Sequence, residues 1–124
     1  MSYKKFEIWQ LVDEVVVEIH QMTLTELPKF EMFEEGAQIR RSSKTTKSCI
    51  VEGYGRRRYK ADFVKFLIYA LSSNDESTDH LETLYKTKSL CNQEVYNHIH
   101  NKLEVLGKKI NFFIKGVDNT EWHP

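Results

Sequence analysis

Apolar residues recur along the chain, in four separate stretches, with the spacing of one side of an α-helix. In each stretch an apolar side chain returns every three or four positions, which places these side chains in one stripe at about 100° per residue. Short polar segments join the stretches, so consecutive helices should pack antiparallel. The pattern predicts an all-α fold, an antiparallel up-down-up-down four-helix bundle of residues 1–117 followed by a polar tail at 118–124. The predicted helices span residues 6–22, 35–52, 59–88 and 93–115.

The second predicted helix has the thinnest apolar stripe. Its small hydroxyl side chains should let it approach a neighbouring helix closely, and they can bond back to the carbonyl four residues earlier. Gly36 is expected to loosen the start of this helix. Gly53 is predicted to end it in the left-handed conformation, and Gly116 to end the fourth helix. The stripe consists of Ile39, Ser43, Thr46 and Ile50.

Length and composition agree with one globular domain. The chain has 124 residues, of which 40% are hydrophobic and 29% are charged. No apolar run approaches the roughly 18–20 residues of a membrane span, and the first residues lack the apolar stretch of a signal peptide. Cys49 and Cys91 are isolated thiols, which suit a reducing compartment. We therefore expect a cytoplasmic protein without a membrane segment.

The charge distribution adds a basic segment to this picture. The chain carries 18 Lys and Arg against 18 Asp and Glu, yet residues 38–60 hold eight cations and one acid. These cations lie on the second helix and beyond its glycine turn, so we expect them to be close together in space. They predict contacts to the phosphate backbone of RNA or DNA without sequence readout, while Tyr54 and Tyr59 are predicted to stack on unpaired bases. The predicted contact residues are Arg40, Arg41, Lys44, Lys47, Arg56, Arg57, Arg58 and Lys60.

The same cations allow a second interpretation, which the residues alone leave open. Arginine stems pack well at protein interfaces, and a neighbouring helix or subunit would offer acids as partners. Acidic clusters occur at Glu34-Glu35 and at Asp75-Glu76. On this interpretation the protein is a structural or scaffold module that binds protein, its own copies included.

Catalytic and metal-binding patterns are weak. None of the five histidines has a glutamate three residues before it, the spacing that di-iron bundles use. Glu76 and His80 share a helix face, but a solvated pair explains them more simply. A basic helix favours a lowered thiol pKa at Cys49, yet a small half-buried filler is the simpler interpretation. The sequence therefore predicts a non-catalytic protein with no catalytic residue, no metal site and no cofactor.

A set of motifs runs through the chain in a fixed order: Gln38-Ile39-Arg40-Arg41, Ile50-Val51-Glu52-Gly53-Tyr54-Gly55-Arg56, Phe63 with Phe66-Leu67, and Ala70-Leu71-Ser72-Ser73 with Glu76. Pro28, Glu31-x-Phe33 and Trp9-Gln10 extend the set over nearly the whole chain. These motifs resemble those of the small four-helix proteins encoded in intervening sequences of bacterial 23S ribosomal RNA genes. This chain departs from the family at Lys44-Thr45-Thr46, where Val-Ser-Ile is common, at Cys49, where Asn is common, and at Ser72, where Gly is common.

The resemblance implies a four-helix bundle and a ring-like homo-oligomer, with five copies expected. The family is distantly similar in fold to the accessory protein of diversity-generating retroelements, which binds nucleic acid and a reverse transcriptase. By that analogy, RNA or DNA and a nucleic-acid-processing protein are the expected partners beside the chain's own copies. The family motif also makes Arg40, Arg41 and Arg56 candidates for structural roles. Lys44 and Lys47, which belong to this chain in particular, are then the stronger candidates for an exposed contact surface.

Overall fold

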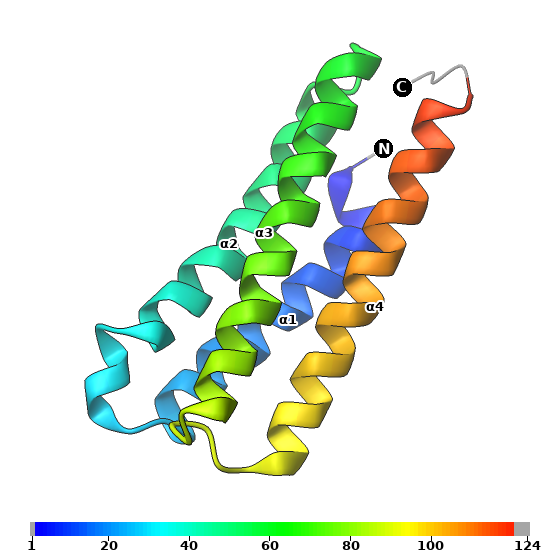
Figure 1. The fold of residues 1–124 in the computed structure, drawn as a ribbon. Coiled ribbons are helices and arrows are strands. Elements are labelled where there is room, and N and C mark those ends of the chain that lie inside the picture. The colour runs from blue at the N-terminus through cyan, green and yellow to red at the C-terminus, as the bar shows by residue number, and fades with distance from the viewer. Residues whose placement is uncertain (1, 121–124) are drawn as a thin grey trace.

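Four long α-helices make up most of the protein in a computed structural model, which describes residues 2–120 (Figure 1). Successive helices alternate in direction, and α1 begins and α4 ends beside the α2–α3 turn. This arrangement confirms the predicted all-α four-helix bundle. None of the helices in the described range is long and apolar enough to cross a membrane. The elements are η1 (Tyr3–Lys5), α1 (Glu7–Thr25), η2 (Lys29–Met32), α2 (Glu35–Gly55), α3 (Lys60–Lys86) and α4 (Gln93–Asp118).

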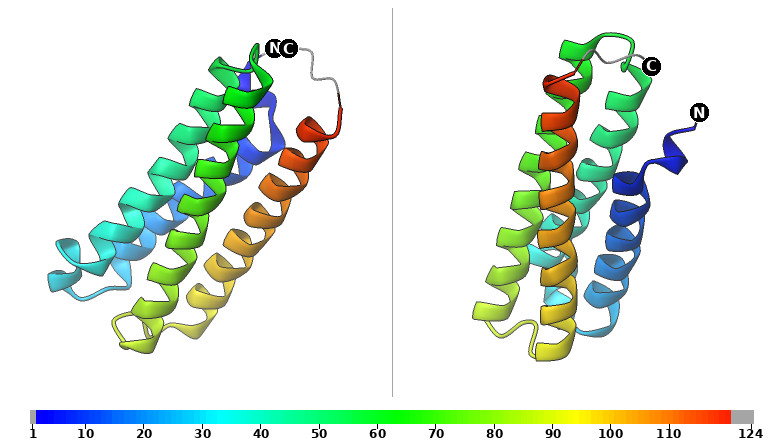
Figure 2. Two further views of the ribbon diagram at one scale, coloured as in Figure 1. Left: turned by 45° about the horizontal axis from the view of Figure 1, so that its top comes forward. Right: turned by 90° about the vertical axis from the view of Figure 1, so that its right-hand side faces the viewer.

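The core lies between the four helices, each of which contributes its predicted stripe. α1 and α3 each pack against both α2 and α4, as the two further views also show (Figure 2). Val12, Ile39, Phe63 and Leu106 come from the four different helices, and the exposed fraction of each is 0%. The 3.6-residue period therefore predicted the buried face of each helix correctly.

The closest helix pair is α2 and α3, which meet through small residues. The hydroxyl oxygens of Ser42 and Ser77 lie 2.7 Å apart between the two helices. An added Cβ atom at Gly53 would lie 3.1 Å from the Cβ atom of Phe66 on α3. The small residues of α2 thus bring its backbone close to a neighbouring helix, as the sequence predicted, and the structure identifies that neighbour as α3.

Two predicted helix ends are wrong. No glycine among residues 2–120 has a positive φ, and α2 continues through Gly53 to Gly55. The last turn of α2 closes instead through the backbone N–H of Arg56, which donates to the carbonyl oxygens of Glu52 and Gly53. Likewise α4 runs through Gly116 to Asp118. Helical hydrogen bonds and packing outweigh the weak preference of glycine for a helix end.

The start of α2 is held rather than loosened. Gly36 is buried, and an added Cβ atom there would overlap the carbonyl oxygen of Glu31 in η2. The Glu31 side chain is itself only 4% exposed. Its carboxylate accepts hydrogen bonds from the Gly36 N–H at 3.3 Å and from the Ser89 hydroxyl at 2.6 Å. One buried acid thus ties the α1–α2 connection to the α3–α4 loop.

Candidate nucleic-acid interface

The eight cations predicted to contact nucleic acid do not form one surface in the structure. Five of them bind partners within the protein. The other three, Arg41, Lys44 and Arg58, are exposed, and their side chains form no ion pair or hydrogen bond within residues 2–120. Their surroundings differ because they point in different directions around α2 and the α2–α3 turn.

Arg40 and Lys47 on α2 bind the segments that precede α2 in the chain. The Nη2 atom of Arg40 donates a hydrogen bond of 2.7 Å to the carbonyl oxygen of Met32. The Nζ atom of Lys47 forms an ion pair of 2.7 Å with Asp13 and lies 5.5 Å from the centre of the Trp9 ring. Lys47, one of the stronger sequence candidates for an exposed contact, is therefore a bridge between α2 and α1.

Arg56 and Arg57 fold back onto the bundle at the α2–α3 turn. Arg56 forms ion pairs with Glu52 at 3.1 Å and with Asp62 at 3.6 Å. The guanidinium of Arg57 lies 3.9 Å from the centre of the Tyr54 ring, and its Nη1 atom donates to the Tyr54 carbonyl oxygen at 3.0 Å. Both arginines thereby help to close the end of α2.

Lys60 binds the end of α4. Its Nζ atom donates to the carbonyl oxygens of Asp118 at 2.8 Å and of Thr120 at 2.9 Å. Carbonyls at a helix C-terminus lack partners inside the helix and attract a cation. Lys60 therefore fixes the last turn of α4 to the first turn of α3, and residues 121–124 of the predicted tail lie outside the described range.

The three unengaged cations lie in two separate places. Arg41 and Lys44 are exposed on the outer face of α2, whereas Arg58 lies on the α2–α3 turn. The part of α2 from Lys44 to Gly55 alone spans about 16 Å at roughly 1.5 Å per residue. The turn therefore does not bring the two groups together, contrary to the expectation from the sequence.

Charge is instead sorted along the axis of the bundle. The half nearer the α2–α3 turn consists of residues 2–15, 46–72 and 106–120, and carries eleven Lys and Arg against six Asp and Glu. The opposite half, residues 16–45 and 73–105, carries seven against eleven. We call these the basic end and the acidic end. Most of the excess at the basic end comes from residues 46–72, which carry six Lys and Arg against two Asp and Glu, and the fold adds residues 106–120, which carry three against one.

The two tyrosines predicted to stack on bases differ in exposure. Tyr59 directly follows Arg58 at the basic end, and 65% of it is exposed. Tyr54 is only 7% exposed, because it packs edge-on against Phe6 at 4.8 Å under the Arg57 guanidinium. The expectation for Tyr54 is therefore wrong, and Tyr59 alone of the pair has an open ring face.

Cys49 and His80, the residues considered above for catalysis or metal binding, form contacts that differ from those of a reactive site. Burial raises the pKa of the half-buried Cys49 thiol, the opposite of an activated thiolate. His80 pairs with Glu35 on α2 rather than with its sequence neighbour Glu76. Within residues 2–120 no group of three or more His, Cys, Asp or Glu is arranged to hold a metal ion.

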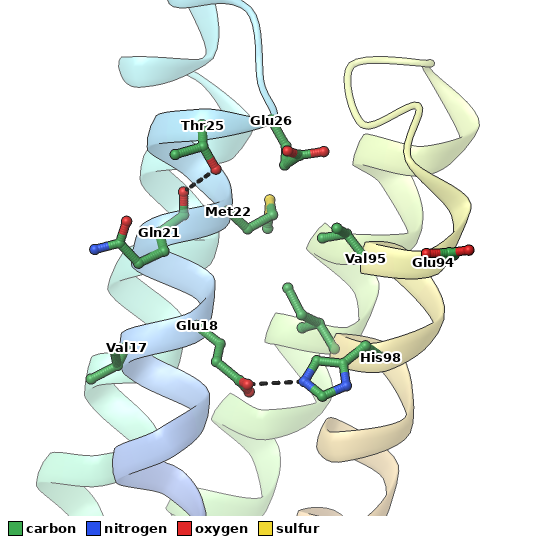
Figure 3. Close-up of a pocket in the computed structure, with 10 residues that line it drawn as sticks. Val17, Glu18, Gln21, Met22, Thr25, Glu26, Glu94, Val95 and His98 are labelled. Carbon is green, nitrogen blue, oxygen red and sulfur yellow. Dashed lines mark hydrogen bonds and ion pairs between the residues drawn. The ribbon is translucent and has the colours of Figure 1, made fainter.

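Glu18 joins α1 to α4 near the acidic end. One of its carboxylate oxygens lies 2.9 Å from His98 Nε2 (Figure 3). The other lies 2.9 Å from Lys102 Nζ. Burial acts to raise the pKa of Glu18, but the hydrogen bonds from His98 and Lys102 outweigh it and hold the pKa below its usual range. The same contact raises the pKa of Lys102.

Glu18→Gln should therefore change how stability depends on acid pH. Since the folded-state pKa of Glu18 is lowered, its ionised form stabilises the fold above the ordinary glutamate pKa of about 4.3, and this contribution is lost as the pH falls through the folded-state value. We expect Glu18→Gln to be less stable than the parent protein at pH 7, with the difference shrinking below about pH 4. Urea unfolding from neutral to acid pH measures this difference. Glu14→Gln, which removes a more exposed acid beside Lys102, is the control, and a difference that does not change with pH would contradict the assignment.

The fold and surface described above define the protein as an all-helical four-helix bundle. It belongs to the 23S rRNA-intervening sequence protein family, whose model matches residues 4–112. The chain is also similar to a crystal structure from Bacteroides thetaiotaomicron, described as a protein with unknown function from the S23 ribosomal protein family. The TM-score is 0.78 at 25% sequence identity, over 87% of this chain and 95% of that chain. No curated protein matches the chain.

Proposed function

We propose that this protein is a non-catalytic, self-associating bundle protein that binds the sugar–phosphate backbone of RNA or DNA at its basic end. The observation that carries the proposal is that Arg58, which has no side-chain partner within residues 2–120, and its sequence neighbour Tyr59 are both exposed at the end where cations outnumber acids. A free guanidinium contacts phosphate, and an open aromatic ring stacks on an unpaired base of any sequence. The proposed ligand is therefore a strand with unpaired bases, bound without sequence readout.

Further exposed lysines lie at the same end of the bundle. Lys4 and Lys5 belong to η1, which is placed against the end of α2 by the contact between Tyr3 and Tyr54, with ring centres 6.3 Å apart. Lys65 lies on the second turn of α3. Cations from different helices at one end would each contact a different phosphate, so binding should weaken steeply as salt is added.

Arg58→Gln combined with Lys65→Gln tests the basic end. Removing two phosphate contacts should weaken binding to single-stranded RNA about tenfold at low salt and make the slope of log K against log salt shallower by about 1–2. Fluorescence anisotropy over a range of salt concentrations measures both quantities. Arg41→Gln combined with Lys44→Gln is the matched control, because it removes the same charge from the outer face of α2, and we expect less than about a twofold effect.

Two results would contradict this proposal. One is the absence of binding by the parent protein at low salt. The other is an equal loss in both double variants, which would mean that net charge matters rather than the basic end.

A scaffold function is the second candidate, favoured by large apolar side chains on the surface. Phe33 at the start of α2 is 87% exposed, and Phe112 on α4 is 80% exposed. Exposed aromatics of this size are typical of protein contact sites. Light scattering on the same double variants separates the two functions. Loss of the oligomer in Arg58→Gln with Lys65→Gln would favour a role of these cations at subunit contacts, whereas an intact oligomer with weakened RNA binding supports the first proposal.

A further inference from the structure

A groove between α1 and α4 lies toward the acidic end of the bundle (Figure 3). Arg58 and Tyr59 lie at the opposite, basic end. Its volume is about 380 Å³. α1 and α4 share the fewest contacts of the four neighbouring helix pairs, so this seam is the loosest in the bundle. The groove is therefore a place where the bundle leaves one helix–helix junction incompletely filled.

The floor of the groove is apolar. Met22 on α1 and Ile99 on α4 line it, and each is 3% exposed, while Val95 is half-buried beside them. Val17 forms the outer edge on α1 and is 57% exposed. An exposed valine beside a buried apolar floor provides surface that a second molecule can remove from water.

The rim of the groove is acidic. Glu26 follows the end of α1, and Glu94 lies in the first turn of α4. Both are labelled in Figure 3 toward the end of the groove where α1 ends and α4 begins. Neither side chain forms an ion pair or a hydrogen bond within the described part of the chain. Glu18 is different, because His98 and Lys102 already bind it. Two unpaired carboxylates beside an apolar floor favour a cationic ligand and disfavour a nucleic acid.

We propose that this groove binds a helical segment of a partner protein, with aliphatic anchors flanked by Lys or Arg. A helix that lies along a seam between two others presents side chains at i and i+3 or i+4 to the same groove. A space of about 380 Å³ holds a few aliphatic side chains but not a whole helix, so the partner would insert anchors while its backbone stays outside. Its cations would then face Glu26 and Glu94.

Synthetic peptides test the groove directly. The probes are three helical peptides that differ in the spacing of their leucines. The first has leucines at i, i+3 and i+7, the second at i, i+4 and i+7, and the third at i, i+4 and i+8. Lysines occupy the remaining polar positions of each peptide. Each has a counterpart in which glutamate replaces lysine. We expect at least one cationic peptide to shift the methyl NMR signals of Val17, Val95 and Ile99, and to bind about tenfold more tightly than its acidic counterpart.

Variants of groove residues outside the buried core make the test specific without endangering the fold. Glu26→Gln with Glu94→Gln should weaken the cationic peptide about fivefold and reduce the salt dependence of its binding. Val17→Ser should weaken it about threefold by removing an apolar contact. The matched control is Glu34→Gln with Glu76→Gln, which removes the same charge outside the groove and should leave affinity within about twofold.

Several outcomes would overturn the proposal. They are the absence of shifts at the groove methyls with every peptide, equal binding of cationic and acidic peptides, or an equal loss in the control variant. If the methyl signals shift with protein concentration alone, and peptide binding is lost as they do, the occupant is a second copy of this chain and not a separate partner.

Discussion

Gly36→Ala will lower the free energy of unfolding by about 2–4 kcal/mol, a large fraction of the stability of a domain of this size. The added Cβ atom would overlap the backbone carbonyl oxygen of Glu31, which has no flexible end that can swing away. Relief therefore requires η2 to move away from the start of α2. That movement would also break the hydrogen bond from the Gly36 N–H to the Glu31 carboxylate. Urea unfolding followed by circular dichroism measures the change.

Two other glycines of the same protein provide matched controls for this substitution. Gly55 and Gly116 are helical, and an added Cβ atom at either position would meet nothing within 4 Å. Because alanine favours a helix over glycine, Gly55→Ala and Gly116→Ala should raise the stability by about 0.5 kcal/mol, less than a mid-helix site because both lie near helix ends. A neutral or stabilising Gly36→Ala would show that the close approach of η2 to α2 is not required for folding.

Glu31→Ala should lower the free energy of unfolding by about 2–3 kcal/mol. The substitution removes the acceptor of the Gly36 N–H and of the Ser89 hydroxyl, and it leaves a cavity where a 4%-exposed side chain stood. The α1–α2 connection and the α3–α4 loop would then lose their shared anchor. Hydrogen exchange should show the first turn of α2 opening more often than the middle of α3.

The conservative variant separates hydrogen bonding from packing at this site. Glu31→Gln keeps the volume and one acceptor oxygen, so we expect about half the loss of Glu31→Ala. The exposed neighbour Glu34 serves as the control, because Glu34→Ala should stay within about 0.5 kcal/mol of the parent protein. Equal effects of Glu31→Ala and Glu34→Ala would rule out a role for the buried carboxylate.

The two proposed binding regions have opposite charge and lie toward opposite ends of the bundle. Arg58 and Tyr59 face outward at the basic end, whereas Glu26 and Glu94 border the groove toward the acidic end. The positive excess at one end and the negative excess at the other cancel in the net charge of the chain, which is zero. Composition alone therefore understates how strongly either end attracts a charged ligand. The two proposals therefore place a nucleic acid strand and a cationic protein segment toward different ends of the bundle.

The basic segment, residues 38–60, shows what a local charge pattern predicts and what it leaves open. Residues 38–60 do hold eight cations and one acid, but Lys47 pairs with Asp13 on α1, and Lys60 binds the carbonyl of Asp118 at the end of α4. These partners lie on other helices, so no window of sequence contains both members of either contact. The sequence identified the charged side chains, and it did not identify which of them remain available.

Gly53 shows the same limit for backbone roles. Its freedom at φ is a property of the residue itself, which led to the prediction of a left-handed helix end. The structure uses instead its lack of a side chain, because Phe66 on α3 lies against it. The tight fit at Gly53 comes from a helix that begins later in the chain, so the local sequence does not contain it.

The amino-acid sequence by itself determined the four helices and their buried faces, because helical periodicity and the burial of apolar stripes such as Ile8, Val12, Val15 and Ile19 are local properties. The small side chains of α2 also predicted that this helix approaches a neighbour closely, while the structure decided that the neighbour is α3. Tertiary structure alone decided which cations are free, why Gly36 has no room for a side chain and Gly53 has only little, and which helix ends share the basic end. Each of these depends on how the elements pack against one another, and contacts between residues far apart in sequence set that packing.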